Sequence, residues 1–224
     1  TKDHYLIYYR QFTAMLALGT EPEEMLRGFL AKEKEPMSAA RQFPLHGAHP
    51  RVDLFNFSNV IATQLPQAAG VALADKLKGS DAVTIVYFGD GASSQGETHE
   101  AMNFAGVHKL PVIFFCENNF FSVCSSLDVR QPPQVKIFEK AKGFGLPSVQ
   151  VDGTNVLDIF EVTQEAVDRA RNGGGPTFIE ALVYRWRGHG GAGDDSATGY
   201  RDPKEVRHWE QFCPIDTFRE LLTE

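Results

Sequence analysis

Two short polar turns, each close behind an apolar run, contain the residues best suited to bind an ion. Gly89-Asp90-Gly91 follows the run 82–88, and Asn118-Asn119 follows the run 110–116. A carboxylate, an amide oxygen and a backbone carbonyl that meet at one point form a hard-oxygen site suited to Mg²⁺, whose other positions go to phosphates and water. Taken alone, either turn is also explained structurally, because glycine permits tight turns, aspartate caps helices and Asn is common in turns.

The two apolar runs are the elements that must position these turns. Both are rich in β-branched and aromatic residues, which is typical of strands buried on both faces of a parallel sheet. The segment 94–109 between them is long enough for a crossover helix, which predicts a right-handed βαβ unit. Because the carboxyl ends of parallel strands meet at one edge of a sheet, we expect the two turns to lie side by side.

The remainder of the chain alternates between helical and strand-like patterns. We interpret residues 1–224 as a single α/β domain in which helices cover both faces of a doubly wound, mostly parallel sheet. Ligands of such sheets bind beyond the carboxyl ends of the strands. The patterns predict helices over 3–18, 64–78, 135–143 and 156–172, strands over 148–151 and 177–186, an irregular polar region over 32–58, and a mobile loop over 187–201.

Composition excludes several classes of function. The 22 Lys and Arg against 29 Asp and Glu give a net charge of −7, which argues against binding to nucleic acid. No apolar run approaches the roughly 18–20 residues of a membrane span, and no signal-peptide pattern opens the chain. The three cysteines lack paired spacing and indicate neither a disulfide framework nor a zinc cluster. We therefore expect a cytoplasmic protein with no membrane or nucleic-acid partner.

Three further motifs match known patterns only in part. The G-x-G-x-x-G spacing at 188–193 precedes Asp195 and no helical pattern, so it lacks the helix N-terminus that holds a dinucleotide's pyrophosphate. The turn at 89–91 has Ser94 where the third glycine of that motif belongs. His99-Glu100 begins like a zinc-protease helix, but position 103 is asparagine. A dinucleotide-dependent reductase is thus disfavoured.

The two polar turns and the text around them resemble a known family. The GDG and NN pair matches the thiamine diphosphate fingerprint, and the chain is similar to the α subunits of 2-oxo acid dehydrogenases over essentially its whole length. RQFPLH and ATQLPQA are more similar to the branched-chain members than to the pyruvate members. Relative to the family, the chain begins late and stops early. The matching stretches are 9–10, 62–70, 87–97, 114–123 and 188–201.

The resemblance implies a thiamine-diphosphate-binding fold and a reaction. The expected activity is oxidative decarboxylation of a branched-chain 2-oxo acid with transfer of the acyl group to lipoyl. The implied partners are a β subunit, which supplies the activating glutamate in an assembly of two α with two β chains, and a lipoyl-bearing acyltransferase core. The location is the cytoplasm, or the mitochondrial matrix in a eukaryote. A pyruvate or acetoin dehydrogenase α subunit and a non-catalytic α/β assembly subunit remain alternatives.

The resemblance also implies which residues hold the cofactors. Asp90, Asn119 and the backbone carbonyl of Phe121 match ligands of Mg²⁺; the family usually has tyrosine in place of Phe121, which leaves a carbonyl ligand unchanged. Tyr9 and Arg10 match a pair that meets the diphosphate, for which the forked guanidinium is suited. Other positions that line the cofactor are Asn59, Ile61, Gly91 and Ala92. A potassium site is matched by Ser58, the carbonyl of Val60, Thr63 and Gln64, which a helix N-cap would also explain.

His189 is the expected catalytic residue. It matches a loop histidine that faces the cofactor's reactive carbon and diphosphate, and imidazole can move a proton near neutral pH. The family commonly has a second histidine next, where this chain has Gly190. Because the glycine-rich loop has little apolar surface to bury, we expect it to close over the cofactor when ligand contacts hold it. His46 matches a histidine near the substrate entrance.

Overall fold

A parallel sheet forms the centre of the computed structural model, which describes residues 2–39, 41–52, 54–190, 193 and 195–223. Within these residues the strand order is β2-β3-β1-β4-β5-β9-β8, and every neighbouring pair is parallel except β2 with β3. In chain order the strands are β1 (His4–Leu6), β2 (Gly47–His49), β3 (Leu54–Phe57), β4 (Thr84–Gly89), β5 (Val112–Asn118), β8 (Ser148–Asp152) and β9 (Thr177–Leu182).

Strands β4, β5 and β9 end together at one edge of the sheet. The register runs from Thr84 opposite Val112 to Gly89 opposite Glu117, and β9 continues it with Leu182 opposite Asn118. The two apolar runs are therefore the neighbouring strands that the sequence predicts, and the polar turns that follow them leave the sheet side by side.

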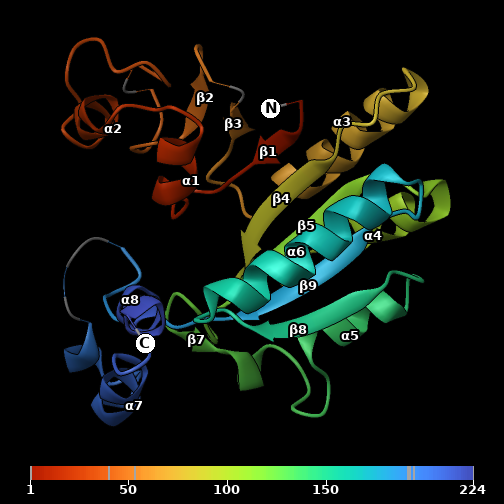
Figure 1. Cartoon of the computed structure of the whole chain (residues 1–224). Helices are drawn as coiled ribbons and strands as arrows, with labels where there is room; N and C mark the ends of the chain where they lie inside the picture. Colours follow the sequence, from red (N-terminus) through yellow and green to blue (C-terminus); the bar gives the residue numbers. More distant parts are fainter. Residues whose placement is uncertain (1, 40, 53, 191–192, 194, 224) are drawn as a thin grey trace.

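Helices cover both faces of this sheet, which confirms the doubly wound α/β fold. The small side chains of α3 and α4, with Ile137 and Ala141 of α5, pack on one face, and Ala166 and Ala170 of α6 pack on the other. Figure 1 shows α6 crossing one face, with α3 and α4 behind the sheet. The helices are α3 (Gln64–Leu77), α4 (Gly96–His108), α5 (Ile137–Lys142) and α6 (Val156–Arg171), as the sequence patterns predict to within a few residues.

Smaller elements complete the fold at its two ends. A separate apolar cluster around Ile7, Met15 and Met25 joins α1 (Phe12–Ala17) and α2 (Pro22–Phe29) to the β1–β3 side of the sheet. A two-stranded ribbon of β6 (Phe121–Ser122) and β7 (Ser125–Ser126) follows β5. Helices α7 (Pro203–Trp209) and α8 (Pro214–Thr223), which the sequence patterns did not predict, lie near the C-terminus (Figure 1). None of the described helices is both long and apolar enough to cross a membrane.

Three elements differ from the sequence prediction. Residues 3–18 do not form one helix, because residues 4–6 pair as a parallel strand with both β3 and β4, and only the second half is helical. The region 32–58 contains β2 and β3. The last predicted strand ends at Leu182, because its neighbour β5 ends at Asn118 and the bond from Val183 N to Asn118 O is the last between them. Pairing with distant strands overrides the helical periodicity in the first case, and in the second case β3 pairs with β1, which lies far earlier in the chain.

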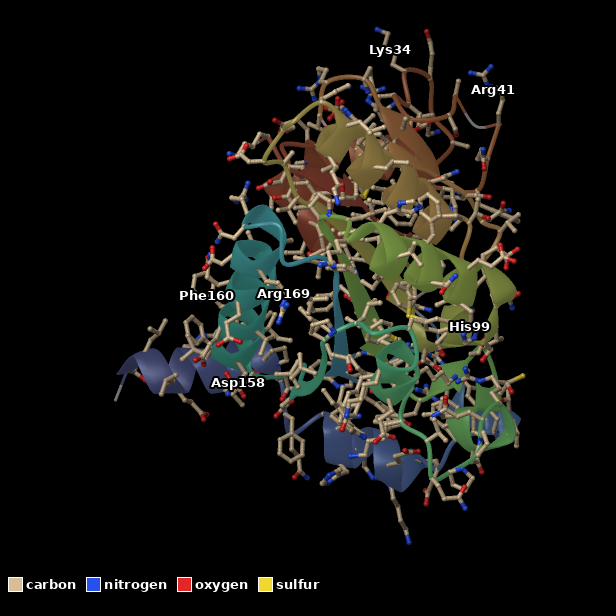
Figure 2. The ribbon with its side chains drawn as sticks, turned by 90° about the vertical axis from the view of Figure 1, so that its right-hand side faces the viewer. Lys34, Arg41, His99, Asp158, Phe160 and Arg169 are labelled. Atoms are coloured by element: carbon tan, nitrogen blue, oxygen red, sulfur yellow. The ribbon has the colours of Figure 1, made fainter. Side chains whose placement is uncertain are left out.

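The sheet's core predicts a large loss of stability on truncation of Phe178. This ring is buried beneath α5 and meets Phe88 edge to face at 5.9 Å between ring centroids. Phe178→Ala should lower the free energy of unfolding by about 3–5 kcal/mol, because it leaves a cavity in a close-packed core. Phe160 lies on the outer side of α6 and is 68% exposed (Figure 2), so Phe160→Ala should change it by less than about 0.5 kcal/mol. Denaturant titration monitored by circular dichroism measures both; equal losses would contradict this account of the core.

Candidate functional site

A cavity of about 540 Å³ opens beyond the carboxyl ends of β4 and β5. Its walls come from the β1–α1 connection, the segment before α3, the turns after β4 and β5, and the loop after β9. Of the residues expected to contact a cofactor, metal or substrate, all but Thr63 line it. They are Tyr9, Arg10, His46, Ser58, Asn59, Val60, Ile61, Gln64, Asp90, Gly91, Ala92, Asn119, Phe121 and His189.

Asp90 is a buried carboxylate at the floor of this cavity. It begins a 3₁₀ turn directly after β4, is 1% exposed, and pairs with the guanidinium of Arg130, which also donates to the Asp90 carbonyl at 3.2 Å. Asp90 does not cap α4, whose N-cap is Gln95. The turn's alternative structural explanation, a helix cap, is therefore wrong for this carboxylate.

The turn after β5 brings the second polar group to the same floor. The side chain of Asn119 is buried, and its Oδ1 accepts a hydrogen bond from Phe121 N at 3.2 Å and one from Arg185 Nε at 3.4 Å. Gly91 faces this turn at close range: a Cβ atom there would lie 2.5 Å from Ser122 Oγ. A side chain at position 91 would have to push Ser122 aside, whereas glycine lets the two turns approach this closely.

The donor set suits a hard cation better than a soft one. The described residues contain no group of three or more His, Cys, Asp and Glu side chains that could hold a metal ion. An ion at Asp90 would therefore depend on amide and carbonyl oxygens and on oxygens of a bound ligand, as Mg²⁺ commonly does. The expected ligands have this chemistry: the carboxylate of Asp90, the amide oxygen of Asn119 and the backbone carbonyl of Phe121.

Arg10 joins the N-terminal segment to the loop after β9. Its Nη2 lies 3.0 Å from Tyr9 Oη and 3.1 Å from His189 Nδ1, and its Nη1 donates to the His189 carbonyl at 3.1 Å. Because guanidinium has only donors, Nδ1 of His189 must accept in the neutral ring, which leaves the proton on Nε2. Nε2 lies 3.4 Å from Tyr9 Oη. The pair expected to meet phosphate and the histidine expected to move a proton thus occupy one wall.

The surroundings of His189 favour its neutral form. Burial lowers the pKa of His189, the positive charges of Arg10 and Arg185 act in the same direction, and the carboxylate of Asp195 opposes them. In this tautomer the neutral ring presents Nε2–H as a hydrogen-bond donor, and it could accept a proton only at Nδ1, once Arg10 no longer donates to that atom.

The loop after β9 is fixed at Asp195. This carboxylate accepts from the backbone N of His189 at 3.2 Å and from the side chains of Tyr200 and Arg201. Arg201 in turn donates to the carbonyls of Arg185 and Arg187. Positions 191, 192 and 194 of the predicted mobile loop lie outside the described residues, and its closure over a ligand stays a prediction.

The four residues of the expected potassium site make contacts with protein groups. Ser58 Oγ accepts from Val60 N at 3.0 Å, Val60 O accepts from Thr63 N at 3.4 Å, and Gln64 Nε2 donates to Tyr87 O at 3.1 Å. Thr63 is the N-cap residue of α3, yet its side chain makes no capping hydrogen bond. A potassium ion at these groups therefore stays a prediction.

His46 lines the cavity beside Tyr9. Its ring stacks on Tyr9 with 5.8 Å between centroids, and it is largely buried. The substrate role that the resemblance implies for it stays a prediction.

Sequence reasoning missed the buried groups that support the site. Glu117 is the last residue but one of β5, and its carboxylate accepts from the side chains of Tyr8 and, at 2.5 Å, Gln11. Burial raises the pKa of Glu117. Arg130 and Arg185 likewise received no role. The available signal was the position of Glu117 directly before Asn118-Asn119, where strand alternation turns it to the face opposite Asn118.

Comparisons with known proteins identify a family match and similar proteins for this chain. Residues 1–224 match the family described as "Dehydrogenase E1 component". The chain is 39% identical over 222 residues to 2-oxoisovalerate dehydrogenase subunit alpha of Bacillus subtilis, covering 99% of this chain and 66% of that protein. It is 44% identical over 163 residues to pyruvate dehydrogenase E1 component subunit alpha of Staphylococcus aureus, covering 73% of this chain and 44% of that protein.

A solved structure agrees with the fold. A protein of Mycobacterium smegmatis described as thiamin diphosphate-dependent superposes with a TM-score of 0.54 at 22% identity, covering 82% of this chain and 29% of that one. At this identity the likeness concerns the fold alone. The chain spans slightly less than two thirds of the length of the Bacillus relative and less than half of the Staphylococcus relative.

The contacts of His189 lead to a titration experiment. The pKa of His189, followed by NMR of the ring protons, should lie below its ordinary value of 6.5, because burial and the charge of Arg10 disfavour imidazolium. Arg10→Met should raise it. Arg51→Met, which removes an exposed guanidinium paired with Glu24, should leave it unchanged. A wild-type pKa above 6.5 would contradict the described surroundings.

Proposed function

Since this chain belongs to the dehydrogenase E1 component family, we propose that it acts as the α subunit of a branched-chain 2-oxo acid dehydrogenase. The reaction is thiamine-diphosphate-dependent oxidative decarboxylation of the 2-oxo acid, with transfer of the acyl group to lipoyl. One observation carries the proposal: Asp90, Asn119, Arg10 and His189, brought from four segments, line a single cavity.

The choice of a branched-chain substrate rests on how much of this chain each relative matches. The match to the 2-oxoisovalerate enzyme extends over 99% of the chain, whereas the match to the pyruvate enzyme covers 73%. The higher identity of the shorter match, 44% against 39%, keeps pyruvate as the second candidate substrate.

The residues that line the cavity fit both the diphosphate of the cofactor and the Mg²⁺ ion that would bind it. Asp90, the amide oxygen of Asn119 and the carbonyl of Phe121 would hold Mg²⁺, and Arg10 with Tyr9 would bind the diphosphate oxygens. A divalent cation would compete with Arg130 for Asp90. When bound, thiamine diphosphate supplies a carbon nucleophile and an electron sink for the electrons left by departing CO₂. Ser58, Val60, Thr63 and Gln64 are the proposed potassium site.

His189 is the group of this chain placed to move a proton. Its Nδ1 is engaged by Arg10, so Nε2–H is the donor, and Tyr9 Oη at 3.4 Å orients it. The carboxylate of Asp195 accepts from the backbone N–H of His189 and so holds this backbone in place. His46, stacked on Tyr9, would contact the substrate near the entrance.

Features of the cavity support a partner subunit. Four apolar side chains that line it are between 49% and 65% exposed: Val123, Ile61, Val60 and Phe43. Among the described lining residues, Asp90 is the only carboxylate, and it is engaged at the metal end. We infer that a β subunit covers this rim and brings the glutamate that activates the cofactor, in an assembly of two α and two β chains. The acyl product would pass to a lipoyl-bearing acyltransferase core in the cytoplasm.

Asp90 offers the most direct test of the metal assignment. Asp90→Asn keeps the size of the side chain and removes its charge, so Mg²⁺-dependent affinity for thiamine diphosphate should fall about 10- to 100-fold, as expected for loss of a charged contact. Asp158→Asn, on α6 (Figure 2) and not among the residues that line the cavity, is the control. Calorimetric titration measures both, and unchanged affinity in Asp90→Asn would contradict the assignment.

The role of His189 is tested by kinetics of the chain assembled with its β subunit. His189→Ala should lower turnover of a branched-chain 2-oxo acid by about 10²–10⁴-fold at saturating cofactor, the typical contribution of a positioned acid or base. A residue that only binds diphosphate would instead raise the cofactor concentration needed for half-maximal rate. Recovery of wild-type turnover at saturating thiamine diphosphate would make His189 a binding residue.

A further inference from the structure

Glu180 is a buried carboxylate that the chemistry above does not use. It lies on β9, is 1% exposed, and accepts three hydrogen bonds. Oε1 accepts from Asn118 Nδ2 at 2.7 Å, and Oε2 accepts from the backbone N of Phe138 at 3.0 Å and from Gln150 Nε2 at 3.1 Å. A buried charge is strongly unfavourable without such donors, so its geometry is tightly defined.

The bond to Asn118 connects this carboxylate to the turn that carries the proposed metal ligands. Asn118 Nδ2 is held by Glu180, which directs its Oδ1 to accept from Phe120 N at 2.9 Å. Phe120 has a φ of 68°, in the left-handed region that a phenylalanine rarely adopts, so the turn needs an external constraint. Asn119 and Phe121 flank this residue.

We propose that Glu180 is a positioning residue for the metal-binding turn, acting through Asn118. The inference rests on the proposed function and adds a residue to it: of the two asparagines, Asn119 meets the ion and Asn118 transmits the position of Glu180 to it. Glu180 thereby ties the turn to β8 and to the start of α5, which are not part of the cavity wall.

The ionised carboxylate matters because an amide cannot replace it. All three groups that contact Glu180 are donors, and glutamine has only one oxygen. In Glu180→Gln, the one remaining side-chain oxygen stays where Phe138 N and Gln150 Nε2 donate to it. The new NH₂ group then points toward Asn118. The Asn118 amide then rotates to accept from it, and its own NH₂ faces the N–H of Phe120. The turn loses its constraint while the side-chain volume stays the same.

The test is calorimetric titration of Mg²⁺ in the presence of saturating thiamine diphosphate, on the chain assembled with its β subunit. Glu180→Gln and Asn118→Ala should each weaken Mg²⁺ binding about tenfold, and the double variant should weaken it no further, because both act on one linkage. Gln150→Ala, which removes a donor from the other oxygen, should stay within twofold of the wild type. Exchange of the Phe120 amide proton should speed up in the first two variants only.

Each outcome decides the matter. Mg²⁺ affinity within twofold of wild type in Glu180→Gln, or additive losses in the double variant, would overturn the positioning role even if thermal stability falls. Should Glu180→Gln fail to fold, Asn118→Ala decides alone, because Glu180 keeps its other donors there. Wild-type chain that binds no Mg²⁺ with thiamine diphosphate would overturn the proposed function as well as this inference.

Discussion

The parallel register of β4, β5 and β9 is the constraint from which the candidate site follows. Because these strands end level with one another, the polar turn after β4 and the polar turn after β5 leave the sheet at one edge. A shift of one residue would turn each side chain to the opposite face. Asp90 and Asn119 would then no longer lie at one cavity floor, and Gly91 would no longer face Ser122.

Buried carboxylates secure this edge from within the sheet. Glu117 and Glu180 belong to neighbouring strands and lie on opposite faces, since Glu117 faces Tyr8 and Gln11 and Glu180 faces Asn118 and α5. Each is costly to bury unless its donors are in place, which restricts the conformations that the strand ends can adopt. Directional polar contacts thus give the site a precision that apolar packing alone does not supply.

The wall that carries Arg10 and His189 depends on contacts between segments 179 residues apart. Arg10 follows β1, the strand next to β4, and His189 follows β9, the strand next to β5, so the sheet brings both to the same edge. Asp195, Tyr200 and Arg201 then hold the loop of His189 against that edge. The hydrogen bond from Arg10 at 3.1 Å gives this histidine its tautomer, and burial together with the charge of Arg10 favours its neutral form.

The local sequence pattern by itself determined the central βαβ unit, the fold class and the two polar turns. These features can be recognised without tertiary contacts, because they depend on long apolar runs and on the glycine and asparagine residues that follow them. Resemblance to a family added Tyr9, Arg10, His46 and His189, which local pattern does not distinguish from other residues of the same types. Only the tertiary structure decided that residues 4–6 form a strand, since parallel pairing with β3 and β4 overrides helical periodicity. The tertiary structure alone also showed that Arg130 pairs with Asp90 and that Asn118 donates to Glu180. Such pairs join residues distant in sequence and leave no periodic signal.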